Sequence, residues 1–154
     1  MQRIKEKKII VHSKGALGIT LFGLGPNSLP VGAIAKLQQF LNENTFWARN
    51  RTYKSLKSML RNSSVVISVW DENEIIGFGR ATTDQVFRAV LWDIVVARKY
   101  QKLGIGKVVL EKLLQSPKIK NVQKIYLMTT NCSDFYKQLD FEIVRNQNLL
   151  LLEQ

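Results

Sequence analysis

The chain has 154 residues, of which 45% are apolar and 23% are charged. This length suits one domain, residues 1–154, with residues 1–15 as a flexible or accessory strand segment, and it can bury a core without disulfides. The single cysteine, Cys132, excludes an internal disulfide, and one cysteine with one histidine argues against a zinc site, so no metal is expected. No apolar run approaches the roughly 20 residues that span a membrane.

Basic residues are in large excess. The 23 lysines and arginines outnumber the 12 acidic residues and give a formal net charge of +11. This excess favours an anionic partner such as nucleic acid, a phosphate-bearing cofactor or an acidic surface. Solvated lysines on an ordinary surface explain it equally well. The basic N-terminus is followed only by Ile9-Ile10-Val11, which is too short for a secretory signal, so no export signal is expected.

The first part of the chain is predicted to form strands and then two helices. Ala16–Phe22 is apolar and ends at Gly23-Leu24-Gly25-Pro26, which predicts a strand entering a turn, while Lys8–His12 could add a short pairing strand. Pro30 suits a first helical turn, and apolar residues recur after it at helical spacing. They are Val31, Ile34, Ala35, Leu37, Phe40 and Leu41.

A second helix is predicted over Thr52–Leu60, capped by Thr52, with Leu56, Met59 and Leu60 facing inward. The segment before it, Phe46-Trp47-Ala48-Arg49-Asn50-Arg51, is both aromatic and basic. Such a segment could stack nucleic-acid bases, but buried aromatic rings beside solvated arginines are the commoner arrangement.

Three strands are expected next, at Val65–Trp70, Glu74–Ala81 and Arg88–Val96. The third is apolar on both faces apart from Asp93, as in a central strand covered on both sides. An amphipathic helix then begins near Ile105 and is stopped by Pro117. The remaining predictions are a strand over Lys124–Thr129, a short helix over Ser133–Gln138, and closing strands over Phe141–Val144 and Asn148–Leu152. This order predicts an α+β domain with a mixed sheet.

Gly104 and Gly106 stand where the third of these strands passes into the amphipathic helix. Glycine allows a ligand to approach bare backbone, and the free N–H groups and dipole of a helix N-terminus attract phosphate. A Walker A loop is excluded because Gln101 and Val108 occupy its glycine and hydroxyl positions, and a dinucleotide fingerprint is excluded by Val109. A plain glycine turn that opens a helix remains an alternative.

The segment around these glycines resembles the Gln/Arg-x-x-Gly-x-Gly acyl-CoA motif of the GNAT superfamily of N-acetyltransferases. It reads Val95-Val96-Ala97-Arg98-Lys99-Tyr100-Gln101-Lys102-Leu103-Gly104-Ile105-Gly106. A later segment resembles the family's second signature, except that glycine is usual at position 140. It consists of Asn131-Cys132-Ser133-Asp134-Phe135-Tyr136, followed by Asp140-Phe141. Four further segments resemble cyanobacterial and plastid acetyltransferases, which include plant serotonin N-acetyltransferases. These segments are Phe46–Thr52, Val69–Asp71, Ile76–Thr82 and Arg88–Val96. The resemblance is specific from about Thr45 to Phe141.

The resemblance implies a mixed central sheet, splayed beside the cofactor, and acetyl-CoA as cosubstrate. It assigns Ile94, Val95 and Val96 to pantetheine. The pyrophosphate is assigned to Gln101, Lys102, Leu103, Gly104, Ile105, Gly106 and Lys107, with Asn131 and Phe135 completing the cofactor site. It also implies a plastid-encoded stromal protein or a cyanobacterial cytoplasmic one.

Transfer of an acetyl group to an amine requires a neutral amine, a polarised carbonyl and a proton for the leaving thiolate. By resemblance to the family, Tyr136 is the acid. Asp93 is the candidate base, directly or through water, because a carboxylate in an apolar strand is costly unless it is paired or functional, and burial should raise its pKa. The N–H of Val95 is the expected oxyanion donor. Cys132 has no histidine near it in sequence, so we expect direct transfer in a ternary complex.

The acceptor stays open among arylalkylamines such as serotonin, protein lysines and protein N-termini, and Trp70, Phe78 and Trp92 could line an aromatic pocket. The rival classes are a basic nucleic-acid-binding module and a CoA-binding regulator without catalysis. We expect no membrane partner and regard a nucleic-acid partner as the weaker alternative. A homodimer is compatible with the sequence.

Overall fold

The structure is a computed structural model, and it describes residues 7–13 and 32–154. Its described part contains a five-stranded sheet in the order β1-β2-β3-β4-β5. The strands are β1 (Lys8–Ser13), β2 (Val65–Asp71), β3 (Glu74–Thr83), β4 (Arg88–Val96) and β5 (Lys124–Leu127). Neighbouring strands from β1 to β4 are antiparallel, whereas β5 runs parallel to β4, so the sheet is mixed.

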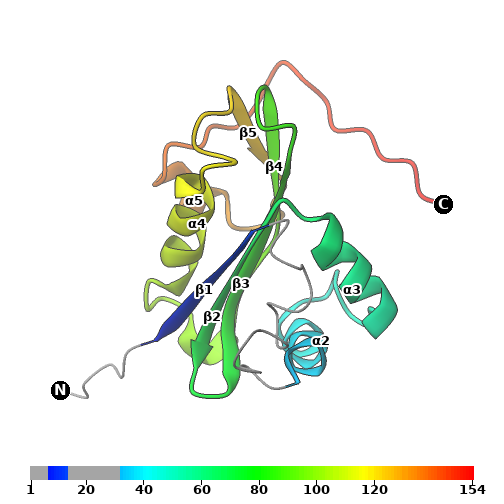
Figure 1. Cartoon of the computed structure of the whole chain (residues 1–154). Helices are drawn as coiled ribbons and strands as arrows, with labels where there is room; N and C mark the ends of the chain where they lie inside the picture. The colour runs from blue at the N-terminus through cyan, green and yellow to red at the C-terminus, as the bar shows by residue number, and fades with distance from the viewer. Residues whose placement is uncertain (1–6, 14–31) are drawn as a thin grey trace.

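Helices cover both faces of this sheet (Figure 1). One face carries α2 (Ala33–Asn44) and α3 (Tyr53–Asn62). The other carries α4 (Ile105–Gln115) and the short α5 (Ser133–Lys137), and the 3-10 turn η1 (Arg98–Tyr100) leads from β4 towards α4. The predicted α+β class with a mixed sheet between helices is therefore confirmed.

The N-terminal predictions are tested in part. The expected pairing strand exists as β1, which runs antiparallel to β2 with Lys8 opposite Trp70. The first predicted helix appears as α2, beginning at Ala33 and burying Leu37, Phe40 and Leu41. The predicted strand over 16–22, its turn at 23–26 and the helix start at Pro30 and Val31 lie outside the described residues.

Helix α3 begins as its sequence predicts. The Thr52 side chain accepts a hydrogen bond from the backbone N–H of Ser55 at 3.1 Å, which satisfies one of the free donors of the first turn. The helix buries Leu56 and Leu60 against the sheet, and Met59 is partly buried.

The most buried strand is β2, not β4. Six consecutive residues of β2, from Val65 to Trp70, are buried because helices cover both faces and strands flank both edges. In β4 only Ala89, Leu91 and Val95 are buried. As expected of a central strand, β4 lies between β3 and β5 in a sheet with helices on both faces (Figure 1), although β5 pairs only with its first four residues.

The two closing strands predicted over 141–144 and 148–152 are absent from the structure, and this prediction is wrong. The chain after Phe141 is extended but does not return to pair with β5, and Figure 1 shows its red end running away from the sheet. A strand forms only where a neighbour supplies the partner for its backbone groups. Leu149–Leu152 are consequently 77 to 89% exposed.

Among the described residues, no helix has the length and apolar character needed to cross a membrane.

Candidate active site

Strands β4 and β5 pair over a short stretch and then part. Residues 88–91 lie opposite residues 124–127, and no strand of the described sheet continues beside Trp92–Val96 on that side. The sheet therefore opens next to the segment assigned to pantetheine. This is the splay that the family resemblance implied.

A bulge in β4 marks where the opening begins. Phe78 faces Val95 and Arg80 faces Trp92, so Asp93 and Ile94 together oppose the single residue Gly79. Asp93 takes up the extra length with a φ of 50°, in the left-handed region. A bulge of this kind bends the strand and increases its local twist, which helps to separate β4 from β5.

The loop after β4 ends in an exposed helix N-terminus. Lys102 and Gly104 both have positive φ, and Gly104 caps α4 without a side chain. The first hydrogen bond within the helix runs from the Val108 N–H to the Gly104 carbonyl at 3.1 Å. The N–H groups of the three residues before Val108 therefore have no carbonyl partner within the helix. A Cβ atom built on Gly104 would meet nothing within 4 Å. These residues fit an anion such as a pyrophosphate held by backbone donors.

Three predicted cofactor residues from different elements converge at Gly106. A Cβ atom at Gly106 would lie 3.3 Å from Cζ of Phe135 and 3.5 Å from Cγ2 of Val96. The start of α4, the end of β4 and α5 thus meet at one place. Gln101 contributes a long contact, with Nε2 3.4 Å from the Val96 carbonyl. Of the other assigned residues, Leu103 is 68% exposed.

Tyr136 lies beside Phe135 at this junction. Its ring makes edge contacts with Phe135 and Phe141, at centroid distances of 5.0 and 6.0 Å. Burial raises the pKa of Tyr136 to about 12, with a smaller contribution from Cys132. The phenol therefore keeps its proton at neutral pH, as an acid in the reaction must.

Asn131 and Cys132 occupy the loop between β5 and α5, and both are exposed. Sγ of Cys132 lies 3.3 Å from Oδ1 of Asn131, and the Cys132 N–H donates to Oγ1 of Thr129. His12 lies in β1, where its ring nitrogen Nε2 is 3.1 Å from Oγ of Ser68. The described residues contain no group of three His, Cys, Asp or Glu side chains that could hold a metal.

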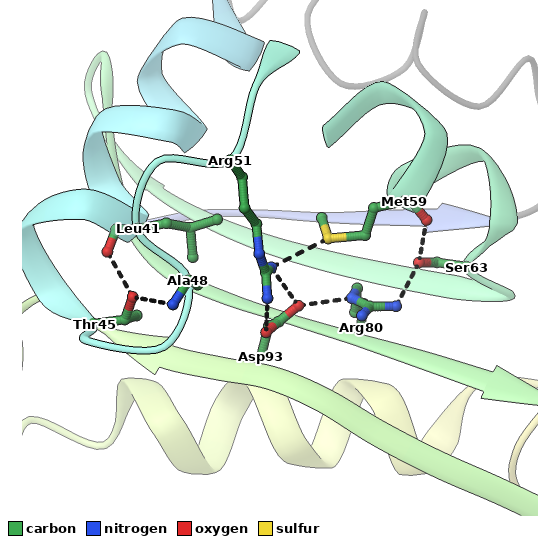
Figure 2. A network of polar contacts seen from close by, with 8 residues as sticks. All are labelled: Leu41, Thr45, Ala48, Arg51, Met59, Ser63, Arg80 and Asp93. Carbon is green, nitrogen blue, oxygen red and sulfur yellow. Dashed lines mark hydrogen bonds and ion pairs between the residues drawn. The ribbon is translucent and has the colours of Figure 1, made fainter. Parts of the chain in front are cut away.

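Asp93 points away from this junction, into the space under α3 (Figure 2). Arg51 donates to both of its carboxylate oxygens, at 2.9 and 3.1 Å, and Arg80 donates from Nε at 2.8 Å. We call Arg51, Arg80 and Asp93 the arginine-aspartate cluster. The Asp93 side chain is only 6% exposed.

The charge state of Asp93 differs from the sequence-based expectation. Burial by itself raises the pKa of this carboxyl, but hydrogen bonds and attraction from Arg51 and Arg80 outweigh burial, and the pKa lies below its ordinary value. The expectation of a raised pKa is therefore wrong. The sequence did not single out either arginine as a partner, because the pairs lie 42 and 13 residues from Asp93.

The aromatic residues are distributed differently from the expectation. Trp70 and Phe78 are 1% and 0% exposed and belong to the core, so neither lines an acceptor pocket. Trp92 is partly buried, donates from its indole N–H to Oγ1 of Thr82 and lies beside Arg80. Phe46 and Trp47, expected to be buried, are 68% and 51% exposed and form an edge-to-face pair at 5.0 Å.

The splayed mixed sheet and the glycine-capped N-terminus of α4, which lies against Val96 and Phe135, define a domain of the type that binds an acyl-CoA. The model of the acetyltransferase (GNAT) family matches residues 34–141, which is most of the chain. The chain belongs to the acetyltransferase (GNAT) family, whose members use acetyl-CoA as cosubstrate.

Curated relatives come from algae, cyanobacteria and plants. The uncharacterized N-acetyltransferase ycf52 of Pyropia yezoensis is 34% identical over 140 residues, covering 88% of this chain and 79% of the algal protein. Histone acetyltransferase TAP1 of Glycine max is 32% identical over 68% of this chain. The chain spans 60% and 53% of the length of the ycf52 protein of Porphyra purpurea and the ycf52-like protein of Prochlorococcus marinus, and half of the Glycine max protein.

Solved structures confirm the fold. A GNAT family acetyltransferase protein from Streptococcus pneumoniae superposes with a TM-score of 0.70 at 17% identity, covering 97% of this chain and 99% of its own. Glucosamine-6-phosphate N-acetyltransferase from Arabidopsis thaliana gives a TM-score of 0.63 at 16% identity, with the same coverage.

Proposed function

We propose that this chain transfers the acetyl group of acetyl-CoA directly to a primary amine in a ternary complex. The observation that carries the proposal is the convergence of Val96, Gly106 and Phe135 beside the opening between β4 and β5. The helix N-terminus at Gly104 offers donors for the pyrophosphate, and the net charge of +11 favours approach of a phosphate-rich ligand.

Tyr136 serves as the acid in this proposal. Its raised pKa keeps a proton on the phenol, which can be given to the sulfur that leaves when the thioester breaks. The N–H of Val95, next to the bulge, is our candidate for the donor that stabilises the oxyanion.

Asp93 is assigned an indirect role. Because Arg51 and Arg80 engage its carboxylate, it holds the bulge and the two arginines in place, and the amine proton leaves through water. Asp93 is a positioning residue in this scheme. It keeps its negative charge throughout the reaction.

The acceptor is proposed to approach from the face that carries α2 and α3. On this face Phe46 and Trp47 expose their rings in the connection that also supplies Arg51. An exposed aromatic pair suits the flat ring of an arylalkylamine such as serotonin. A protein lysine or N-terminus is the alternative acceptor, and it is supported by the histone acetyltransferase named among the relatives. A plastid or cyanobacterial setting is supported by chloroplastic relatives in Arabidopsis thaliana.

The test is an acetyl-CoA turnover assay that offers serotonin, tryptamine, polyamines and lysine peptides side by side. We expect CoA release with at least one amine, and we expect Tyr136→Phe to lower kcat by about 100-fold or more while the KM for acetyl-CoA changes little. Tyr126→Phe in β5 is the matched control and should retain activity.

Three outcomes would contradict the proposal. Acetyl-CoA binding without turnover on any amine would indicate a CoA-binding regulator. Nucleic-acid binding that weakens steeply with salt, without acetyl-CoA binding, would indicate the basic module. Unchanged kcat in Tyr136→Phe would remove the tyrosine from the acid role and leave the enzyme assignment standing.

A further inference from the structure

The connection between α2 and β2 carries basic residues and no acidic ones. Residues 44–70 include five arginines and lysines and lack both aspartate and glutamate. The five residues are Arg49, Arg51, Lys54, Lys57 and Arg61, and we call them the α3 basic surface. An excess of one charge on a single element attracts ligands of the opposite charge.

Three of these side chains line the solvent face of α3. Lys54, Lys57 and Arg61 follow one another at intervals of three and four residues, so they project from the same side of the helix. Leu56 and Leu60 face the other way, into the core. The three basic side chains are exposed, and no carboxylate of the described residues forms an ion pair with them. Their charge is therefore available to a ligand.

Arg51 connects this helix with the arginine-aspartate cluster. Its Nη1 lies 3.4 Å from Sδ of Met59 in α3 and 2.9 Å from Oδ2 of Asp93 in β4. Figure 2 shows Arg51 reaching from the segment before α3 to Asp93. Arg51 and Arg80 together outweigh the single charge of Asp93, so the cluster is itself net positive. The α3 basic surface therefore leads to the bulge in β4, where the opening towards β5 begins.

Exposed aromatic rings accompany this charge. Phe46, Trp47 and Tyr53 are 68, 51 and 49% exposed, and they lie in the connection before α3 or at its first residue. A small arylalkylamine can cover the aromatic pair but has no anionic group for the α3 basic surface. From Lys54 to Arg61 the helix rises about 10 Å, the length of about three residues of an extended polypeptide. A polypeptide with acidic side chains can contact the rings and the basic surface together.

A nucleic acid would supply the same negative charge, but two observations favour the polypeptide. The planes of Phe46 and Trp47 are 84° apart, so the pair does not offer two parallel platforms for successive bases. The proposed reaction also requires a nucleophilic primary amine. Lysine side chains and chain termini carry such an amine, whereas the amino groups of nucleic-acid bases are conjugated with an aromatic ring.

We propose that the α3 basic surface docks an acidic segment of a polypeptide acceptor, whose lysine or N-terminal amine then enters the opening between β4 and β5. The inference rests on the proposed function and deepens it by naming a class of acceptor, the amines of acidic polypeptides. Because the attraction is electrostatic, it raises the rate of encounter and lowers KM, and salt screens it.

The first experiment compares peptides that differ only in the charge beside the reacting amine. Each has a blocked N-terminus and one lysine, flanked on both sides by two glutamates, two glutamines or two arginines. We expect kcat/KM to be about ten-fold higher for the glutamate peptide than for the glutamine peptide, and lowest for the arginine peptide. The preference should shrink when sodium chloride is raised from about 20 to about 300 mM.

The triple variant Lys54→Glu, Lys57→Glu, Arg61→Glu should lose or reverse this preference. The matched control replaces three equally exposed lysines elsewhere by glutamate and should keep it. These lysines are Lys112, Lys120 and Lys124. Arg61 and Lys112 both lie in the last turn of a helix, so each variant loses one favourable interaction with a helix dipole. Both variants should acetylate the best small amine of the wild type at the same rate, since their net charges are equal.

The second experiment measures binding without catalysis. Fluorescence anisotropy of the labelled glutamate peptide, with CoA present, should give a Kd that the α3 triple variant raises about ten-fold and the control variant does not. Peptide binding that depends on the α3 basic surface, without turnover of any amine, would support docking and overturn the proposed function.

Two results would overturn the inference alone. One is acetylation of small amines with equal kcat/KM for the glutamate and glutamine peptides. The other is a single-stranded RNA of equal charge that binds the wild type more tightly than the glutamate peptide and loses its binding in the α3 triple variant. That result would assign the α3 basic surface to nucleic acid.

Discussion

At the scale of single residues, two arginines hold Asp93 in its charged form, although its side chain is buried in a largely apolar strand. A carboxylate whose lone pairs already accept three hydrogen bonds has little capacity to take a proton near neutrality. Replacing Asp93 should therefore lower the stability of the fold more than it impairs removal of the amine proton.

We therefore predict that Asp93→Asn destabilises the fold by about 2 to 4 kcal/mol, because it leaves Arg51 and Arg80 partly buried without their counter-charge. Urea unfolding measures this change. The pH profile of kcat/KM supplies the second readout, and its limb near neutral pH should persist in the variant. Disappearance of that limb, with the fold intact at the assay temperature, would restore Asp93 as the base.

His12 makes the stability of the fold depend on pH. Burial lowers its pKa from 6.5 to about 4, so the unfolded chain binds a proton more readily than the folded one. The stability it contributes is complete above pH 6.5 and is lost as the pH falls towards 4. The full shift corresponds to about 3 kcal/mol.

The prediction is a fall in the urea midpoint of the wild type between pH 7.5 and pH 4.5. His12→Gln removes the titrating ring while keeping an amide able to bond Ser68, so its midpoint should change less over the same range. Parallel pH dependence in the two proteins would assign the effect to other groups.

At the scale of elements, two glycines of β3 allow α4 to pack closely against the sheet. A Cβ atom at Gly77 would lie 2.7 Å from Cγ2 of Ile105, and one at Gly79 would lie 2.7 Å from Cγ1 of Val109. Real contacts are longer, so α4 rests directly on bare strand backbone. This close packing helps to fix the height of the helix whose N-terminus forms the proposed pyrophosphate site.

Gly79→Ala should lower the free energy of unfolding by about 1 to 3 kcal/mol, since Val109 is fully buried and its branched side chain cannot turn aside. Thermal unfolding checks this. Gly106→Ala is the contrasting variant, because its Cβ meets the end of the Phe135 ring at 3.3 Å. It should leave the melting temperature unchanged or higher while raising the KM for acetyl-CoA. Equal losses of stability in the two variants would refute the distinction.

The elements that could be predicted from sequence are those with a strong local pattern. Thr52 at a helix start and the helical spacing after Ile105 both act within a few residues, and both helices are present. Asp140, where the resemblance led us to expect glycine, adopts a left-handed backbone with φ 65°, a conformation in which aspartate is enriched among non-glycine residues.

The features that sequence could not supply depend on contacts between distant residues. Arg51 and Arg80 reach Asp93 from other elements, and the exposure of Phe46 and Trp47 depends on how α2 and α3 pack. The closing strands predicted over 141–144 and 148–152 do not form, since no strand of the described chain pairs with these segments. An apolar pattern alone does not provide the partner strand that a sheet requires.

At the scale of the whole molecule, the proposed function places the two substrates on opposite sides of the sheet, and this has a kinetic consequence. The acyl-CoA would bind at the glycine-capped N-terminus of α4, and the acceptor would approach from the face that carries α2 and α3 (Figure 1). In that arrangement the two ligands do not compete for one entrance, and neither has to depart before the other arrives. Initial rates plotted in double-reciprocal form against each substrate should give intersecting lines, whereas parallel lines would indicate that the acetyl group rests on the protein between two half-reactions.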